Sequence, residues 1–319
     1  MNVHWYSTLL ALWLIELPVL GQANPHKVLH DALVLENRGN FEAAAEYAKL
    51  AINSGSLTGA ELGRGYIILG LSSQGRGNAI DAQIAFEHSL RILEHDREHV
   101  EDYASALDEY AGLYVDLGQL DVAVPMCVKA LRLHQKIGEH TGAALSLMQL
   151  AQLALARHRV REAHKYLQQA SEQIESAADL TDDDKALLLE SQGSLALAEH
   201  KASAAIPLYQ HALEVVKQSR GEQHWLVGWE YMLLGNANAE SGDLNVALAD
   251  MRNGIAILDH ALGKGNPKSL VAELAYARVL DRIGLRVEAA QVRRTVERAR
   301  KEHSGNQCAG CTVSVAAFQ

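Results

Sequence analysis

The sequence predicts an all-α protein, a right-handed superhelical solenoid of about seven antiparallel helix pairs. One pattern of residues recurs seven times along the 319-residue chain, at intervals of 38 to 42 residues. Within each copy, small and bulky residues are three, four and seven positions apart, which is helical spacing and not strand alternation. The composition, with 48% hydrophobic and 21% charged residues, is that of a soluble globular protein.

Each copy of the pattern is anchored by a glycine or a histidine. The anchors are Gly39, Gly77, Gly118, His158, His200, Gly242 and Gly284. An alanine stands five residues after each anchor, at positions 44, 82, 123, 163, 205, 247 and 289. A glycine or alanine stands seven residues before it: Ala32, Gly70, Ala111, Ala151, Gly193, Gly235 and Ala277. We expect the small residue before the anchor to let two helices of one unit approach closely.

A bulky or apolar residue usually follows four positions after the repeated alanine. Examples are Phe86, Cys127, Leu167, Tyr209 and Met251. Each unit is therefore predicted to be two antiparallel helices with one apolar face. A single unit cannot bury that face alone, so stacking makes the array cooperative and quasi-linear.

These small, bulky and alanine positions resemble those of tetratricopeptide repeats, over residues 24–303. The segments LDVAVPMCVKAL and ASAAIPLYQHAL are similar to the longer repeats typified by kinesin light chain, and both carry a proline, Pro125 and Pro207. The resemblance implies a non-catalytic scaffold or adaptor that binds a protein or peptide on the concave face of the array. It does not indicate which ligand.

The first 23 residues have the layout of a secretory signal. An apolar core from Leu9 to Leu20 precedes small residues at Gly21 and Ala23, which predicts cleavage after Ala23 and a periplasmic or extracellular location. Two features oppose this prediction, because no Lys or Arg precedes the core and Glu16 interrupts it. The alternative is an uncleaved leading helix on a cytoplasmic protein. The apolar core is too short for an integral membrane span.

The C-terminal tail, residues 304–319, contains the sequence CAGC and a short alternating segment, TVSV. In an exported protein, Cys308 and Cys311 are candidates for a local or intermolecular disulfide, and unpaired thiols are the alternative. The alternating segment either docks as a strand or is disordered. Cys127 occupies the bulky position of the third repeat and is expected to be an inert buried side chain.

The stretch HDREH, with His95 and His99, matches the H-x-x-E-H pattern of one class of zinc peptidase. Histidine recurs at this place before other repeats, at His140 and His224, and Asn266 stands there before the last one. His99 is therefore predicted to be a connector residue near a helix start, with Asp96 as a possible N-cap. We expect no zinc at this stretch and no cofactor elsewhere.

Composition and motifs argue against several other functions. The net charge of −10 argues against nucleic acid or an anionic membrane as the main partner. The chain has no phosphate-binding glycine loop and no nucleophile elbow, so we do not expect an enzyme. A rival to the binding scaffold is a structural, self-associating envelope component. It would use the tail strand and the seventh repeat, where residues 278–301 hold eight basic and three acidic residues.

The repeat register predicts a ligand groove lined by the first helix of each pair. Positions displaced by −6, −3, +1, +4 and +5 from the small residue are expected to face it. The predicted peptide-binding residues are Leu145, Met148, Gln152, Trp229, Met232, Asn236, Arg278 and Arg282. Apolar walls with a basic end suit an extended or helical peptide with an acidic terminus. In the alternative interpretation, Trp229 and Met232 pack between helices and the arginines solvate a terminal repeat.

Overall fold

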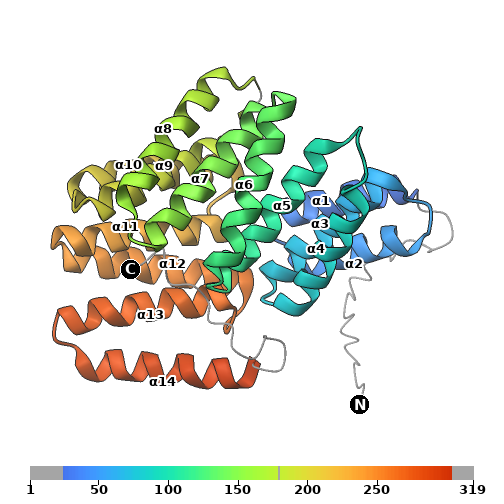
Figure 1. The fold of residues 1–319 in the computed structure, drawn as a ribbon. Coiled ribbons are helices and arrows are strands. Elements are labelled where there is room, and N and C mark those ends of the chain that lie inside the picture. The colour runs from blue at the N-terminus through green and yellow to red at the C-terminus, as the bar shows by residue number, and fades with distance from the viewer. Residues whose placement is uncertain (1–23, 179, 304–319) are drawn as a thin grey trace, which may run out of the picture.

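The computed structural model describes residues 24–178 and 180–303. Within these ranges the regular secondary structure is α-helical throughout, and fourteen helices form seven antiparallel pairs (Figure 1). The first helices of the pairs are α1 (Pro25–Asn37), α3 (Gly59–Gly75), α5 (Val100–Asp116), α7 (His140–Ala156), α9 (Asp182–Ala198), α11 (Trp225–Ser241) and α13 (Pro267–Arg282). The second helices are α2 (Phe41–Asn53), α4 (Ala79–Leu93), α6 (Leu120–Ile137), α8 (Val160–Ser176), α10 (Ala202–Arg220), α12 (Leu244–Leu262) and α14 (Arg286–His303).

The seven anchors all have a left-handed backbone, which is why the pattern holds glycine at five of them. Their φ angles run from 57° at His158 and 60° at His200 to 97° at Gly242. A residue with positive φ just after a helix satisfies the last carbonyl groups and turns the chain toward the next helix. The anchor therefore marks the turn inside each helix pair, as the sequence predicts.

Where the small residue of a first helix is glycine, it packs against the bulky residue of its partner helix. A Cβ atom added at Gly193 would lie 2.8 Å from the ring of Tyr209, and one at Gly70 would lie 2.7 Å from the ring of Phe86. All seven repeated alanines are completely buried. These contacts confirm the predicted pairing and explain why the position excludes larger side chains.

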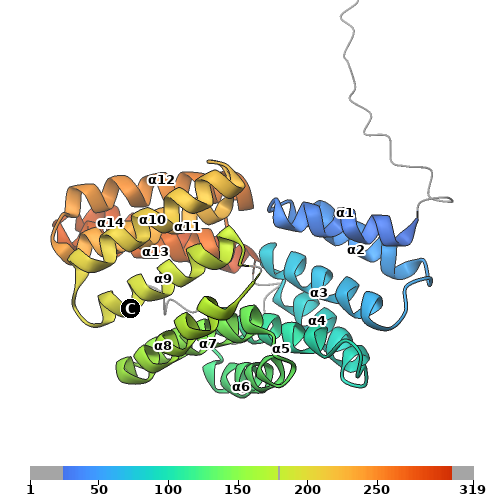
Figure 2. The ribbon, with the colours of Figure 1, turned by 90° about the horizontal axis from the view of Figure 1, so that it is seen from above.

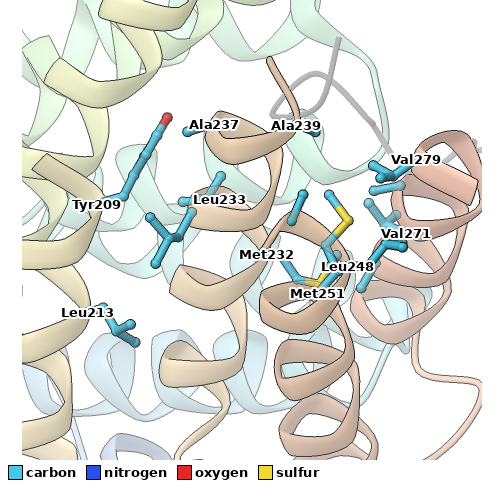
Figure 3. Close-up of a cluster of buried hydrophobic side chains, with 14 of the residues drawn as sticks. Tyr209, Leu213, Met232, Leu233, Ala237, Ala239, Leu248, Met251, Val271 and Val279 are labelled. Carbon is cyan, nitrogen blue, oxygen red and sulfur yellow. The ribbon is translucent and has the colours of Figure 1, made fainter. Parts of the chain in front are cut away.

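The largest hydrophobic cluster lies in the last three pairs, between α9 and α14. Figure 3 shows Tyr209 and Leu213 on one side of α11 and Met251 and Val271 on the other. Smaller clusters continue the core through the earlier pairs. Each pair therefore depends on its neighbours for burial of its apolar face.

First helices of successive pairs contact one another directly, from α1 with α3 through to α11 with α13. They form the inner layer of the superhelix, and the array bends so far that α1 approaches the end that contains α11 and α13 (Figure 2). The first pair consequently lies beside the start of the sixth, and the second pair beside the start of the seventh. In the described ranges, no helix is long and apolar enough to cross a lipid bilayer.

The HDREH stretch lies in the connector between α4 and α5. α4 ends at Leu93 and α5 begins at Val100, so His95 and His99 do not share a helix as the two histidines of a zinc peptidase must. The expected N-cap is wrong: His99 occupies that position, and the Asp96 carboxylate instead accepts hydrogen bonds from the backbone N–H groups of residues 98 and 99. Asp96 therefore stabilises the turn before the helix.

Candidate functional site on the concave surface

Two of the predicted groove residues are in the core. Met148 and Met232 are completely buried, each in a hydrophobic cluster, and Figure 3 shows Met232 beside Met251. The prediction that they line a groove is wrong. Position −3 of a first helix faces the adjacent first helix, so side chains there pack between repeats.

The other predicted residues keep some contact with solvent. Leu145, Gln152, Trp229 and Asn236 are partly buried, whereas Arg278 and Arg282 are exposed. Their role in binding a ligand stays a prediction.

The predicted basic end of the groove is partly neutralised by nearby acids. Arg282 Nη1 lies 2.6 Å from Glu240 Oε1, and Arg293 pairs with Asp281. Although Arg278 is exposed, desolvation by the neighbouring protein, followed by the charge of Arg293, lowers its pKa. An acidic ligand at this end would have to compete with Glu240 for Arg282.

Trp229 belongs to an aromatic and cationic group on the inner layer. The Lys268 ammonium lies 5.3 Å from the ring centroid of Trp225 and 5.7 Å from that of Trp229, a cation–π geometry. Lys268 Nζ also lies 3.5 Å from Asp116 Oδ2, at the end of α5. This group therefore joins the sixth and seventh pairs to the third.

Contacts across the turn of the superhelix form what we call the seam. It joins the last residues of α1, α3 and α5 to residues near the starts of α11 and α13. The Arg220 guanidinium donates to the carbonyl oxygen of Asn37 at 2.6 Å and also pairs with Asp183. The carbonyl groups at a helix C-terminus have no intrahelical partner, and the helix dipole there favours a cation. Arg220 supplies both the donor and the charge.

The second part of the seam lies between α3 and α13. Asn266 Nδ2 donates to the carbonyl oxygen of Gly75 at 2.8 Å, and this bond is buried. A Cβ added at Gly77 would lie 2.6 Å from Pro267 Cδ, so the two backbones are in close contact there. The seam therefore includes direct packing as well as polar contacts.

A cavity of about 600 Å³ opens at the seam, between the end of α1 and the start of α11. Phe41 and Trp225, whose ring centroids are 6.3 Å apart, contribute to its lining, together with the side chain of His224. Burial and the nearby charge of Arg220 lower the pKa of His224 to about 4, so this imidazole is neutral at pH 7.

Carboxyl groups with raised pKa values are the feature of the inner layer that the sequence analysis missed. Burial raises the pKa of Glu190 to about 7, and burial followed by the charge of Glu190 raises the pKa of Glu230 well above its usual value. Glu109 is exposed, but desolvation by the neighbouring helices, followed by the charges of Glu36 and Asp108, raises its pKa as well. Glu190 lies three residues before Gly193, a −3 position like those of Met148 and Met232. A glutamate at this position, which is packed between repeats, was the signal in the sequence that could have pointed to a carboxyl group with a raised pKa.

Cys127 is completely buried, as predicted, and its thiol donates to Gln149 Oε1 at 3.0 Å. Burial raises the pKa of this thiol far above the range in which a reactive thiolate forms. The predicted signal segment 1–23, the tail 304–319 and the cysteines Cys308 and Cys311 lie outside the described residues.

The fold defines a class of protein: an α-solenoid built from stacked antiparallel helix pairs. A sequence profile of the tetratricopeptide repeat matches residues 102–176, which cover the third and fourth helix pairs. The match shows that these two pairs are tetratricopeptide repeats, and the seven stacked pairs give the described residues the fold of a tetratricopeptide-repeat array.

Solved structures share the fold at low sequence identity. A Rap protein complexed with Competence and Sporulation Factor has 13% identity and a TM-score of 0.60, with 89% of this chain and 99% of that chain covered. The apo form of RapI has 12% identity and a TM-score of 0.62, with 88% and 99% covered. The APC/C hetero-tetramer Cut9–Hcn1 has 15% identity and a TM-score of 0.55, with 88% of this chain and 54% of that chain covered. No curated protein matches the chain in sequence.

Proposed function

We propose that the chain is a non-catalytic binding protein that holds an extended or helical segment of another protein, or a peptide, on its concave surface. The observation that carries the proposal is the position of Trp229. It is only partly buried, it lies on the inner layer, and it has Glu190 of α9 on one side and Lys268 of α13 on the other. A partly exposed indole beside charged groups is the kind of residue that dominates binding energies.

The seam supports a narrow ligand in preference to a folded domain. It joins the two ends of the inner layer, so that the concave surface is continuous around the turn and not an open trough. An extended chain can follow such a surface, whereas a folded partner would have to separate the seam. The fold resemblance to a Rap protein that was solved in complex with Competence and Sporulation Factor is in keeping with a binding role.

Arg278 and Arg282 are proposed to hold an acidic group of the ligand. Both are exposed on α13, at the end of the inner layer. The Arg282–Glu240 ion pair is exposed and therefore weak, so a ligand carboxylate can replace Glu240 at little cost. Replacing both arginines with alanine should weaken binding less than loss of Trp229, and it should flatten the salt dependence of binding.

The test is a Trp229→Ala variant assayed against a peptide selected on the wild-type protein from a random library. Affinity should fall roughly 30-fold, which corresponds to about 2 kcal/mol, while the melting temperature stays within about two degrees. Tyr166→Ala, which removes a partly buried aromatic side chain from the second helix α8, is the matched control and should leave affinity unchanged. A Trp229→Ala protein that melts several degrees lower and binds as tightly would show that Trp229 is core.

A further inference from the structure

One pair of positions recurs wherever two successive first helices stack. Position −3 of one first helix, counted from its small residue, is paired with position −5 of the next first helix, counted from the small residue of that helix. The six pairs are Leu29 with Gly65, Ile67 with Ala106, Asp108 with Ser146, Met148 with Leu188, Glu190 with Glu230, and Met232 with Ala272. Four of these pairs are apolar, as expected of a contact between repeats.

The Asp108–Ser146 pair is polar and is compensated at one carboxyl oxygen, Oδ2, while Oδ1 has no hydrogen-bond partner within the described residues. The Ser146 hydroxyl donates to Asp108 Oδ2 at 2.5 Å, and His134 Nε2 lies 3.5 Å from the same oxygen. The carboxylate therefore has a hydroxyl donor and an imidazole beside it, which offsets the cost of removing it from water.

In the Glu190–Glu230 pair, Glu190 has a hydrogen bond from Trp229, but Glu230 lacks a comparable donor or cation. Glu230 is only 2% exposed, and its Oε2 atom has no hydrogen-bond partner within the described part of the chain. A buried carboxyl oxygen without a donor costs several times what a typical hydrogen bond contributes. Two acids therefore meet at a place where the other repeats have apolar or hydrogen-bonded pairs.

The chain's own nearby cation is held beside the pair and not on it. Lys268 lowers the pKa of Glu190 through its charge, but its ammonium lies over the rings of Trp225 and Trp229 and 3.5 Å from Asp116. Trp229 also makes a hydrogen bond to Glu190. The Glu190 carboxyl group is thus next to the proposed ligand anchor, and it is close enough to Glu230 on the adjacent first helix for its charge to raise the pKa of Glu230.

We propose that Glu190 and Glu230 form a pocket for one positively charged group of the bound peptide, an arginine or lysine side chain or an amino terminus. The inference rests on the proposed function and adds to it the charge of the ligand at one position. A guanidinium group suits the pocket better than an ammonium group, because its planar array of donors reaches two carboxylates at once. The Trp229 ring beside the pocket already has the Lys268 ammonium over it at 5.7 Å, so a second cation would stack there only by displacing Lys268 or by using the other face.

The test is peptide selection from a random library on three proteins: wild type, the double variant Glu190→Gln with Glu230→Gln, and the control Glu240→Gln. Glu240 lies on the same helix as Glu230 but is exposed and paired with Arg282. We expect arginine or lysine at one fixed position among peptides selected by the wild type and the control. The double variant should select peptides without that preference.

A second measurement uses one selected peptide in two forms, with arginine or with its neutral isostere citrulline at that position. The wild type should bind the citrulline peptide at least 10-fold more weakly, and the double variant should bind both forms within about 2-fold. Calorimetry in buffers of different ionisation enthalpy should show proton release on binding near pH 6, because the arriving cation displaces the proton held by the pair.

The possible outcomes separate the two proposals. Peptides selected by the wild type without any basic position, or a basic preference that persists in the double variant, would overturn the pocket and leave the binding function standing. If no peptide binds the wild type, both proposals fail. If the double variant does not fold, the citrulline comparison on the wild-type protein still decides, since equal affinity for both forms refutes the pocket.

Discussion

The Asn266 side chain makes two hydrogen bonds that serve different purposes. Its Oδ1 atom accepts from the backbone N–H of Lys268 at 3.0 Å and caps α13, while its Nδ2 atom donates to the carbonyl oxygen of Gly75 at 2.8 Å. One amide group therefore begins the last repeat and joins it to the end of α3. Neither hydroxyl nor carboxylate could do both with the same geometry.

The first prediction separates the two bonds. Asn266→Asp keeps the cap and removes the donor, which leaves the buried carbonyl of Gly75 unsatisfied beside a new negative charge. The free energy of unfolding in urea should fall by about 1–3 kcal/mol, and the radius of gyration should rise as the seam opens. Asn24→Asp, the same change at the exposed cap of α1, is the control and should alter neither quantity. Equal effects of the two variants would show that the seam contributes nothing.

The second prediction concerns the small position of the fifth repeat. Gly193→Ala places a methyl group within 2.8 Å of the Tyr209 ring and should lower the free energy of unfolding by about 1–3 kcal/mol. Gly112→Ala is the control, because its added Cβ meets only the Gln149 amide nitrogen, at 3.3 Å and not an aromatic ring at 2.8 Å, and because alanine favours the helix. Gly112→Ala should be neutral or stabilising, and a stabilising Gly193→Ala would contradict the close packing.

The third prediction concerns the anchors that are not glycine. His200 is exposed and has a φ angle of 60°, a conformation that costs a residue with a Cβ about 1–2 kcal/mol. His200→Gly should raise the free energy of unfolding, by about 0.5–1 kcal/mol after the greater chain entropy of glycine is subtracted. Gly118→His, the reverse change at an equivalent anchor, should be destabilising. Thermal melts of the two variants and the wild type give the comparison.

The fourth prediction is a pH dependence that arises at the seam. The pKa of His224 is lowered from 6.5 to about 4 in the folded protein, so the unfolded chain binds a proton first as the pH falls. The free energy of unfolding therefore carries no penalty from His224 above pH 6.5, and it falls as the pH drops from 6.5 to about 4. At pH 5 the loss should be about 2 kcal/mol. His224→Gln should remove it, measured as the difference between the unfolding curves of variant and wild type at pH 7 and pH 5.

The comparison of His224→Gln with the wild type is needed because other groups change the stability in the opposite direction as the pH falls. Glu109 and Glu190 have raised pKa values, so the folded state binds their protons more tightly and gains stability as the pH falls from 7. A His224→Gln protein with the same loss at pH 5 as the wild type would show that His224 is not the source.

The fifth prediction is export. We propose that the chain is cleaved after Ala23, because small residues stand at Gly21 and Ala23 after the apolar core. Intact-mass measurement of protein from the native host should give a chain that begins at residue 24. A mature protein that retains residue 1 or 2 contradicts the proposal.

The sequence predicted the helix pairs and their internal contacts because each depends on residues close together in the chain. The register that places Gly193 against Tyr209 and His200 at a left-handed turn is local, and it is repeated seven times. The same reasoning failed for Met148 and Met232, since it treated each first helix as if only its own partner and solvent surrounded it. Position −3 also meets the next repeat, where it is buried.

The seam could not be predicted in this way. It depends on the accumulated rotation of all seven pairs, and no short pattern encodes that sum. His224 and Asn266 were visible as repeated connector residues, but their equivalents His99 and His140 make no seam contacts, so the position alone did not distinguish them. The Glu190–Glu230 pair could have been predicted, because the repeat register alone places two acids at positions where successive first helices stack.

The seam also limits how the array can change in length. An open solenoid gains or loses a repeat at either end, or by internal duplication, with only local consequences. Here the carbonyl oxygen of Asn37 has to meet Arg220, and that of Gly75 has to meet Asn266, so one additional pair between them would carry the two ends past each other. The number of helix pairs between these contacts is therefore fixed by geometry, and this part of the molecule is closer to a closed ring than to a chain of interchangeable units.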